Sequence, residues 1–253
     1  MQSILFRCDS AEADQLVAEL WEQGSAGILE EPDGLRAFFA GDADMHGLLD
    51  RYRDIVLDQR EEPATDWTQA SREDWDPISI GERFFVAPPW LDHVPTPSGR
   101  MRLTIDCRRA FGTGRHESTQ LCVEALEHYL GSGDSVADIG CGSGILSLVA
   151  AKLGAGPIVS CDVDPVAVQE TREIARTAAF AGSVNAIRSD WADVVVANIS
   201  AVAIDAMAED LRRVARPGAT LILAGFITEK PPTRFSPEHI ICKYDWSCWV
   251  CRK

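Results

Sequence analysis

The second part of the chain alternates short apolar runs with longer amphipathic stretches, and this alternation constrains the fold more than any other feature. Strand-like runs occupy 135–139, 158–162, 194–198 and 221–225. Helix-like stretches occupy 119–129, 145–153, 165–179 and 203–214. Strands that alternate with helices form a parallel sheet with helices on both faces. We therefore expect residues 100–253 to form a doubly wound α/β domain.

The first sixty residues follow a different pattern. Strand-like runs at 4–8, 27–31, 35–39 and 55–57 flank two helical stretches, which Asp9-Ser10 and Asp42 can cap. The order β-α-β-β-α-β is typical of a small ferredoxin-like α+β domain. Residues 1–60 hold no catalytic cluster, so we interpret them as a domain that recognises the substrate.

Residues 61–99 connect these two parts. Prolines at 63, 77, 88, 89, 95 and 97 exclude a long helix there. We interpret this stretch as a linker that carries a short helix at 68–74 and a strand at 82–87.

A glycine-rich motif lies between the first strand-like run of the α/β domain and the helix after it. It reads Asp138-Ile-Gly140-Cys-Gly142-Ser-Gly144, a spacing of GxGxG that differs from the GxGxxG of dinucleotide sites. A pyrophosphate favours bare backbone amides, without a carboxylate beside them. Asp138 instead suits a ligand with cationic ammonium and sulfonium groups, which indicates S-adenosylmethionine.

Polar residues end the next two recognised strands. Asp162 follows the run 158–161, at the position where doubly wound folds place an acid on the adenosine ribose. We assign Asp164 to the cap of the following helix instead. Asn198 ends the run 194–197 at the edge of the sheet where ligands bind, and it is our candidate for orienting a nucleophilic nitrogen.

Upstream of these strands, Phe111-Gly-Thr-Gly-Arg-His-Glu-Ser-Thr119 reads as a loop that closes over a ligand. His116 within it is a weaker candidate for a general base, because no partner is visible in the sequence.

Composition narrows the possible partners and compartment. A formal net charge of −15 argues against a nucleic-acid partner, and an acidic surface favours a basic protein substrate by electrostatic steering. No apolar run is long enough to span a membrane, and the first residues contain no signal peptide, so we expect a cytoplasmic monomer. Cys248 and Cys251 form the one CxxC motif, but in a strand they point to opposite faces. We expect neither a metal nor a disulfide there.

Four segments closely resemble the PrmA family, the methyltransferases of large-subunit ribosomal protein eleven. These segments read FGTGRHEST, DIGCGSGILSLVAAKLGA, CDVDPVAV and DVVVANISA. Weaker matches lie upstream, at Asp66-Trp67, Pro77, Gly81-Glu82-Arg83 and Pro89-Trp90. The resemblance implies a Rossmann-like class I methyltransferase fold that binds S-adenosylmethionine, with cofactor contacts at Thr119, Gly140, Asp162 and Asn198. From the motif itself we add Asp138, Gly142 and Gly144 as candidate cofactor-binding residues.

The resemblance implies methyl transfer to lysine ε-amino groups, N-terminal α-amino groups, or both, in a ribosomal protein. The chain departs from the family at Arg115 and Glu117-Ser118, where the family has Thr and Pro-Thr, and at Ser71-Arg72. The stretches 186–193 and 228–240 are also shorter. Two alternatives remain: a methyltransferase of another protein or of a small molecule, and a binding module without activity.

Overall fold

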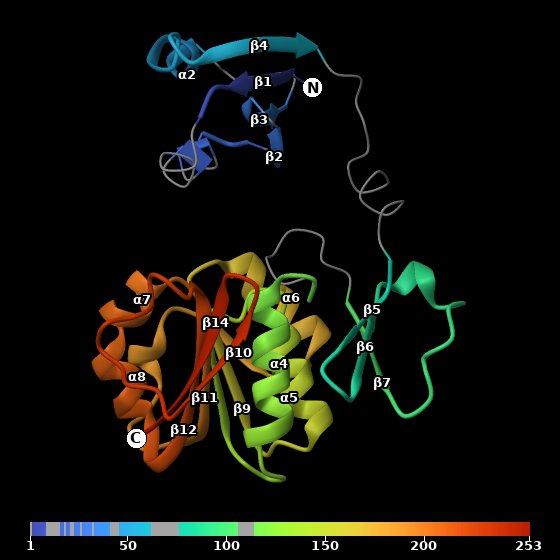
Figure 1. Cartoon of the computed structure of the whole chain (residues 1–253), viewed down its shortest axis with the longest axis vertical. Coiled ribbons are helices and arrows are strands. Elements are labelled where there is room, and N and C mark those ends of the chain that lie inside the picture. The colour runs from blue at the N-terminus through green and yellow to red at the C-terminus, as the bar shows by residue number, and fades with distance from the viewer. Residues whose placement is uncertain are drawn as a thin grey trace. The chain divides into compact units, whose positions relative to one another are not determined.

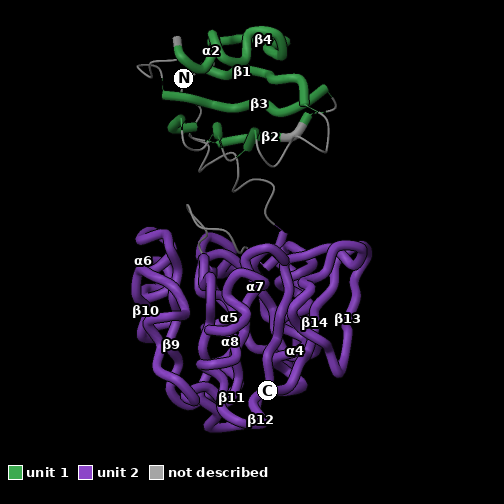
Figure 2. The backbone as a smooth tube through the Cα atoms, turned by 90° about the vertical axis from the view of Figure 1, so that its left-hand side faces the viewer, with its two compact units in different colours: residues 1–74 green, residues 75–253 purple. Residues whose placement is uncertain are grey.

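The structure is a computed structural model of the chain, and its backbone forms two compact units, residues 1–74 and 75–253 (Figure 2). The residues that it describes are 2–8, 16–17, 19–20, 23–25, 27–31, 33–40, 46–61, 76–105 and 114–253. Four sequence predictions fall wholly or partly outside these residues: the caps at Asp9-Ser10 and Asp42, the helix at 68–74, and the first three residues of the loop at 111–119.

The first unit is a four-stranded antiparallel sheet of order β2-β3-β1-β4. Its elements are β1 (Gln2–Phe6), β2 (Gly27–Glu31), β3 (Gly34–Phe39), α2 (His46–Arg51) and β4 (Val56–Glu61). Residues 16–17 and 19–20 are helical, between β1 and β2. Alternate side chains such as Ile4, Phe6 and Phe39 are fully buried against Leu20 and Leu48. The predicted order β-α-β-β-α-β is therefore present in the described residues.

The second unit contains a seven-stranded sheet of order β10-β9-β8-β11-β12-β14-β13 (Figure 1). Its strands are β8 (Val136–Ile139), β9 (Ile158–Asp162), β10 (Ala178–Ala181), β11 (Ala192–Asn198), β12 (Ala215–Ile227), β13 (His239–Lys243) and β14 (Trp246–Arg252). The first five are parallel, as the sequence predicted. The last two run antiparallel to their neighbours, so the sheet is mixed rather than wholly parallel.

Helices cover both faces of this sheet. They are α4 (Glu117–Tyr129), α5 (Ile145–Leu153), α6 (Pro165–Ile174), α7 (Ala201–Ala206) and α8 (Ala208–Val214). Successive residues of β11 point to opposite faces. Val194 and Val196 pack with α4 and α5, whereas Val195 and Ala197 pack with α7 and α8. Figure 1 shows these two helix pairs on opposite sides of the sheet.

Two predicted helices are shorter than the sequence pattern suggested. The helix expected at 165–179 ends at Ile174, Arg176 then takes a left-handed backbone (φ 55°), and β10 starts at Ala178. The helix expected at 203–214 is two helices that meet at Met207. Because alanine is a good helix former, the alanine-rich sequence at both breaks predicts a continuous helix.

The stretch that we interpreted as a linker is partly structured. A small sheet of order β5-β6-β7 is formed by β5 (Ile78–Ile80), β6 (Phe84–Ala87) and β7 (Met101–Thr104). A 3-10 helix, Pro89–Leu91, follows β6. Phe84 and Leu103 are fully buried in the core that also contains α4 and α5. Residues 76–99 therefore belong to the second compact unit, and among them β5 is a strand that the sequence pattern missed.

None of the helices in the described residues combines the length and the apolar composition that crossing a membrane would need.

Candidate functional site

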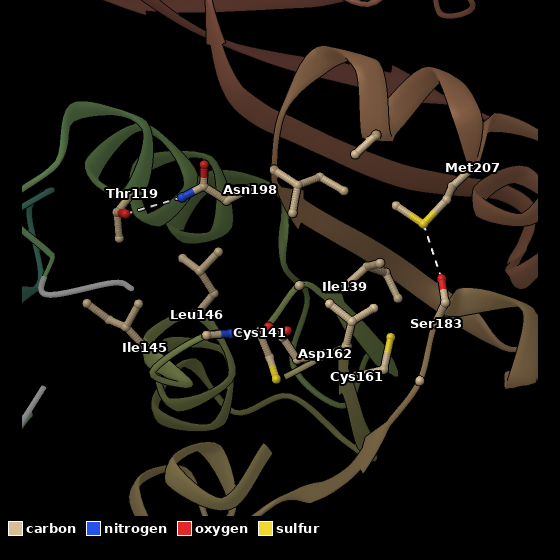
Figure 3. Close-up of a pocket in the computed structure, with 16 residues that line it drawn as sticks. Thr119, Ile139, Cys141, Ile145, Leu146, Cys161, Asp162, Ser183, Asn198 and Met207 are labelled. Carbon is tan, nitrogen blue, oxygen red and sulfur yellow. Dashed lines mark hydrogen bonds between the residues drawn. The ribbon is translucent and has the colours of Figure 1, made fainter. Parts of the chain in front are cut away.

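The predicted polar residues gather at the carboxyl edge of the seven-stranded sheet. From β8 the chain runs outward to β9 and β10, and then returns to β11 on the other side of β8. Ligands of doubly wound sheets bind where the strand order reverses in this way. A cavity of about 320 Å³ opens there. Its lining, drawn in Figure 3, is Thr119, Ile139, Gly140, Cys141, Gly142, Ile145, Leu146, Cys161, Asp162, Val163, Gly182, Ser183, Asn198, Ile199, Ala203 and Met207.

The glycine loop between β8 and α5 passes close to two neighbouring elements. Gly140 has φ 74°, and a Cβ atom there would lie 2.4 Å from Cγ2 of Ile199. Gly144 caps α5 with φ 80°, and a Cβ atom there would lie 2.8 Å from Cα of Thr171 in α6. Gly140 therefore lines the cavity, whereas Gly144 does not and packs against α6. Its predicted contact with the cofactor remains a prediction.

Asp162 ends β9 and lines the cavity, as the sequence predicted. Its Oδ2 accepts a hydrogen bond from the backbone N–H of Gly142 at 3.0 Å, and its Oδ1 accepts one from the N–H of Asp164 at 3.0 Å. A carboxylate has about four acceptor positions, so each oxygen can accept a second bond. Asp162 thus holds the glycine loop and still has acceptor capacity toward the cavity. Asp164 caps α6 by accepting from Val166 N–H, as predicted.

Asp138 lies beneath the glycine loop rather than in the cavity wall. Its side chain is fully buried, and Ser147 Oγ of α5 donates to its Oδ2 at 2.6 Å. Its Oδ1 is buried and has no hydrogen-bond partner within the described residues. Burial raises the pKa of Asp138 to about 6; hydrogen bonds from Ser147 oppose that rise, and the charge of Asp162 adds to it. Asp138 therefore does not line the cavity. Its predicted contact with a cationic cofactor remains a prediction.

Asn198 and Thr119 point toward one another at one side of the cavity (Figure 3). Asn198 Nδ2, at the end of β11, donates to Thr119 Oγ1 in the first turn of α4 at 3.2 Å. Asn198 Oδ1 is buried and has no partner in the part of the chain that the structure describes. The hydroxyl of Thr119 thus fixes the orientation of the amide, and the carbonyl oxygen keeps an unused acceptor position.

His116 has a structural position at the start of α4. Its Nδ1 accepts a hydrogen bond from Ser118 N–H at 3.2 Å and lies 2.8 Å from Ser118 Oγ, so the imidazole caps the helix. Its ring also packs edge-on against Trp246, with the centroids 4.3 Å apart. His116 does not line the cavity, and in this geometry its Nδ1 caps α4.

A sequence profile described as ribosomal protein L11 methyltransferase (PrmA) matches residues 29–253. The chain belongs to the PrmA family. The first unit from residue 29 onward and the whole second unit are covered by this match.

Individual relatives agree with the family match. A ribosomal protein L11 methyltransferase of Thiobacillus denitrificans is 37% identical over 227 residues, which cover 87% of this chain and 74% of that protein. One of Burkholderia multivorans is 40% identical over 177 residues, or 69% of this chain and 58% of that protein. This aligned part spans less than two thirds of the Burkholderia relative.

A solved structure supports the fold of this PrmA-family chain. The ribosomal protein L11 methylase of Lactobacillus delbrueckii subsp. bulgaricus superposes with a TM-score of 0.65 and 25% identity. The superposition covers 71% of this chain and all of that chain. The mixed α/β sheet, with its strand order and its glycine loop, is thus the class I methyltransferase fold that the sequence predicted.

Part of this family site was missed from the sequence. Gly182 and Ser183 follow β10, and they line the cavity at the carboxyl end of that strand. Ser183 Oγ lies 3.2 Å from Met207 Sδ at the junction of α7 and α8 (Figure 3). Met207 lies inside the helix predicted at 203–214, and β10 begins inside the helix predicted at 165–179, so neither the helix junction nor the strand was predicted. Gly182 (φ 146°) lies at the chain turn after β10.

Five of the seven cysteines in the described part of the chain are buried, whereas Cys8 is partly exposed and Cys242 is exposed. Cys248 packs on the α4 and α5 side of the sheet, and Cys251 packs on the α7 and α8 side, which confirms that the two thiols point to opposite faces. Burial raises the pKa of Cys251 to about 12. Among the residues that the structure describes, no three His, Cys, Asp or Glu side chains form a group that would hold a metal ion.

Proposed function

We propose that this chain transfers methyl groups from S-adenosylmethionine to amino groups of ribosomal protein L11, at lysine ε-amines, the N-terminal α-amine, or both. The observation that carries this proposal is the environment of Asn198. Its side-chain oxygen is buried without a partner in the described residues, and the residue lines the same cavity as the glycine loop and the strand-end Asp162. The relatives cited above are named ribosomal protein L11 methyltransferases.

The residues at the sheet edge fit the proposed cofactor. Asp162 would accept hydrogen bonds from both ribose hydroxyls, since its oxygens keep acceptor capacity. Apolar side chains such as Leu146, Ile199 and Met207 offer a surface for the adenine ring and the sulfonium substituents. S-adenosylmethionine supplies an electrophilic methyl group on its sulfonium, so the protein has to position and desolvate the acceptor amine.

Asn198 would orient that amine. A lysine ε-amine must arrive without its proton, and an apolar environment lowers its pKa because burial disfavours the charged form. Leu146, Ile145 and Ile199 provide such an environment at the cavity. Asn198 Oδ1 then accepts an N–H bond from the neutral amine and directs its lone pair. This arrangement needs no general base, in agreement with the capping role of His116.

The first unit would hold the protein substrate. Its own core, formed around Ile4, Phe6 and Phe39, contains no group that we assign to the chemistry. A stable complex with a folded protein needs about 800 Å² of surface on each partner, more than a cofactor cleft provides. The acidic net charge of −15 would attract a basic substrate. With a ribosomal protein as substrate, we place the enzyme in the cytoplasm.

A methylation assay tests the proposed function. Purified full-length chain, recombinant L11 and labelled S-adenosylmethionine should give labelled L11, with whole methyl increments in its intact mass. Asn198→Ala should lower kcat by about 100-fold, because an oriented acceptor is removed from the transition state. Unlabelled L11, together with a labelled protein of another kind in a bacterial lysate, would contradict the assignment of the substrate.

Deletion of residues 1–74 tests whether the first unit holds the protein substrate while the second unit binds the cofactor. We expect the remaining unit to bind S-adenosylhomocysteine with nearly unchanged affinity, because the cavity lies within residues 75–253. Methylation of L11 should be lost. Full kcat/KM in the truncated protein would show that the first unit does not hold the substrate.

A further inference from the structure

The turn between β13 and β14 lies at the same edge of the sheet as the cavity. Ile227, at the carboxyl end of β12, pairs with Trp246 at the start of β14. Asn198 of β11 pairs with Ala224 of β12, and β12 lies between β11 and β14. Two strand spacings, about 10 Å, separate β14 from β11 sideways, and Ile227 lies three residues beyond Ala224 along β12. The turn and Asn198 therefore share this edge of the sheet.

Several contacts hold the turn in place. Lys243 Nζ donates to Gln120 Oε1 of α4 at 2.6 Å, and Trp246 packs on His116 at the start of the same helix. On the other side, Thr228 N–H and Thr228 Oγ1 donate to the carbonyl oxygen of Asp245 at 2.7 and 3.1 Å. The turn is thus tied to the helix that carries Thr119, the partner of Asn198.

Tyr244 stands out at the tip of this turn. It is 82% exposed, although aromatic residues usually bury most of their surface. Its φ of 51° lies in the left-handed region, where two-residue hairpin turns favour asparagine, aspartate or glycine. A bulky residue in this conformation is strained. A residue that is unfavourable for its backbone conformation, and that gains no packing in return, is expected at a functional position.

We infer that Tyr244 is a docking contact for the protein substrate, and that it binds the segment of L11 next to the methylated amine. This inference rests on the proposed function. The ring lies on an exposed turn that is tied to α4 and shares the sheet edge of Asn198, which suits an aromatic anchor at an interface.

Charges around Tyr244 favour a basic segment of that substrate. Asp245 and Glu229 are exposed carboxylates of the two adjoining turns, which are linked by the hydrogen bond from Thr228 N–H to the carbonyl oxygen of Asp245. The ammonium of Lys243 is directed away to Gln120, while Lys230 is an exposed cation of the second turn. A lysine or arginine side chain can stack on a tyrosine face and pair with a carboxylate at once.

Steady-state kinetics on L11 with the full chain test this inference. Tyr244→Ala should raise KM for L11 by about tenfold, with kcat changed less than about twofold, because an interface anchor contributes to binding before the chemistry. Tyr244→Phe should keep KM within about twofold. Tyr244→Asn suits the left-handed turn, so it should raise KM while leaving Tm equal to or above that of the wild type.

Ile240→Ala is the matched control. Ile240 is 53% exposed on β13 and pairs with Trp249, three residues further along the hairpin from the turn. KM should not change in this variant. S-adenosylhomocysteine affinity, measured by calorimetry, should be unchanged in all Tyr244 variants.

Two outcomes overturn the inference by itself: a wild-type KM for L11 in Tyr244→Ala, or a fall in kcat and cofactor affinity at constant KM, which would mean that the turn only supports the cavity. If the wild-type enzyme leaves L11 unmodified, the proposed function fails and the inference fails with it.

Discussion

The neighbouring strands β8 and β9 each carry an aspartate near the carboxyl end, and the two aspartates have different surroundings. Asp138, one residue before the end of β8, is fully buried under the glycine loop with Ser147 as its donor. Asp162, the last residue of β9, lies at the cavity and accepts from two backbone N–H groups. Both were predicted to contact the cofactor, and the cavity lining contains Asp162 but not Asp138.

The difference follows from where each aspartate stands along its strand. Asp138 pairs with Ser160 inside the sheet, so its side chain is directed to one face, where α5 covers it. Asp162 ends its strand, beyond the residue of β9 that pairs with Ile139. Two positions in the sheet register therefore separate a buried carboxyl with a raised pKa from a carboxylate that is available to a ligand.

The largest effect that we expect concerns the packing of the loop after β8 against the helix after β9. Gly144→Ala should lower the free energy of unfolding by about 3–4 kcal/mol. Its left-handed φ disfavours a side chain, and the added Cβ would lie 2.8 Å from Thr171 Cα. Chemical denaturation of both proteins measures the difference.

Gly133→Ala is the control for this substitution. Gly133 also has a left-handed φ of 86°, but a Cβ atom there would meet nothing within 4 Å. The Gly133→Ala substitution should lower the free energy of unfolding by only about 1 kcal/mol. Equal costs at the two glycines would show that the loop is not packed against α6 as described.

A smaller effect is expected at Asp138, and it depends on pH. Burial raises the pKa of Asp138 from 3.8 to about 6, so the folded protein binds this proton more tightly than the unfolded chain does. The resulting stabilisation is complete below pH 4 and is lost as the pH rises through about 6.

Asp138→Asn does not titrate. Its stability relative to the wild type should therefore rise by about 2–3 kcal/mol between pH 4 and pH 8, as measured by denaturation at both pH values. A constant difference between the two proteins would mean that Asp138 is ionised in the folded state throughout this range.

The smallest effect is expected from thiol reagents. Cys141 follows Gly140 in the loop after β8, and Cys161 precedes Asp162 in β9. Burial, and then the charge of Asp138, raises the pKa of each thiol to about 12. Because the thiolate is the reactive form, iodoacetamide at pH 8 should leave both unmodified while it alkylates the exposed Cys242. Mass spectrometry of peptides reads the result. Rapid labelling of Cys141 that S-adenosylhomocysteine suppresses would show that the loop opens.

Much of the fold could be predicted because local pattern and tertiary structure agree. The helix at Ile145–Leu153 and the strand at Ile158–Asp162 have the predicted bounds. Both are bounded by glycine or by a capping aspartate, which are signals within the chain itself. The β10 strand lacked such a signal, because a short run of alanine and phenylalanine fits a helix and a strand equally well.

The site was predictable only in part. The strand-end residues Asp162 and Asn198 were identified, since polar residues after apolar runs mark the edge of a sheet. The bond between Asn198 and Thr119 joins residues 79 positions apart, and that between Ser183 and Met207 depends on a strand that the pattern concealed. Such pairings are set by the packing of the sheet, and no local pattern specifies them.

Calorimetric titration with S-adenosylhomocysteine tests the central claim most directly, namely that the carboxylate of Asp162 in β9, and not the buried carboxyl of Asp138 in β8, contacts the cofactor. Asp162→Ala should weaken binding by about 2–4 kcal/mol, because two charge-assisted hydrogen bonds to the ribose are lost. Asp138→Asn should change it by less than about 1 kcal/mol at pH 8, since Asp138 does not line the cavity. Unchanged affinity in Asp162→Ala, together with a large loss in Asp138→Asn, would contradict the account.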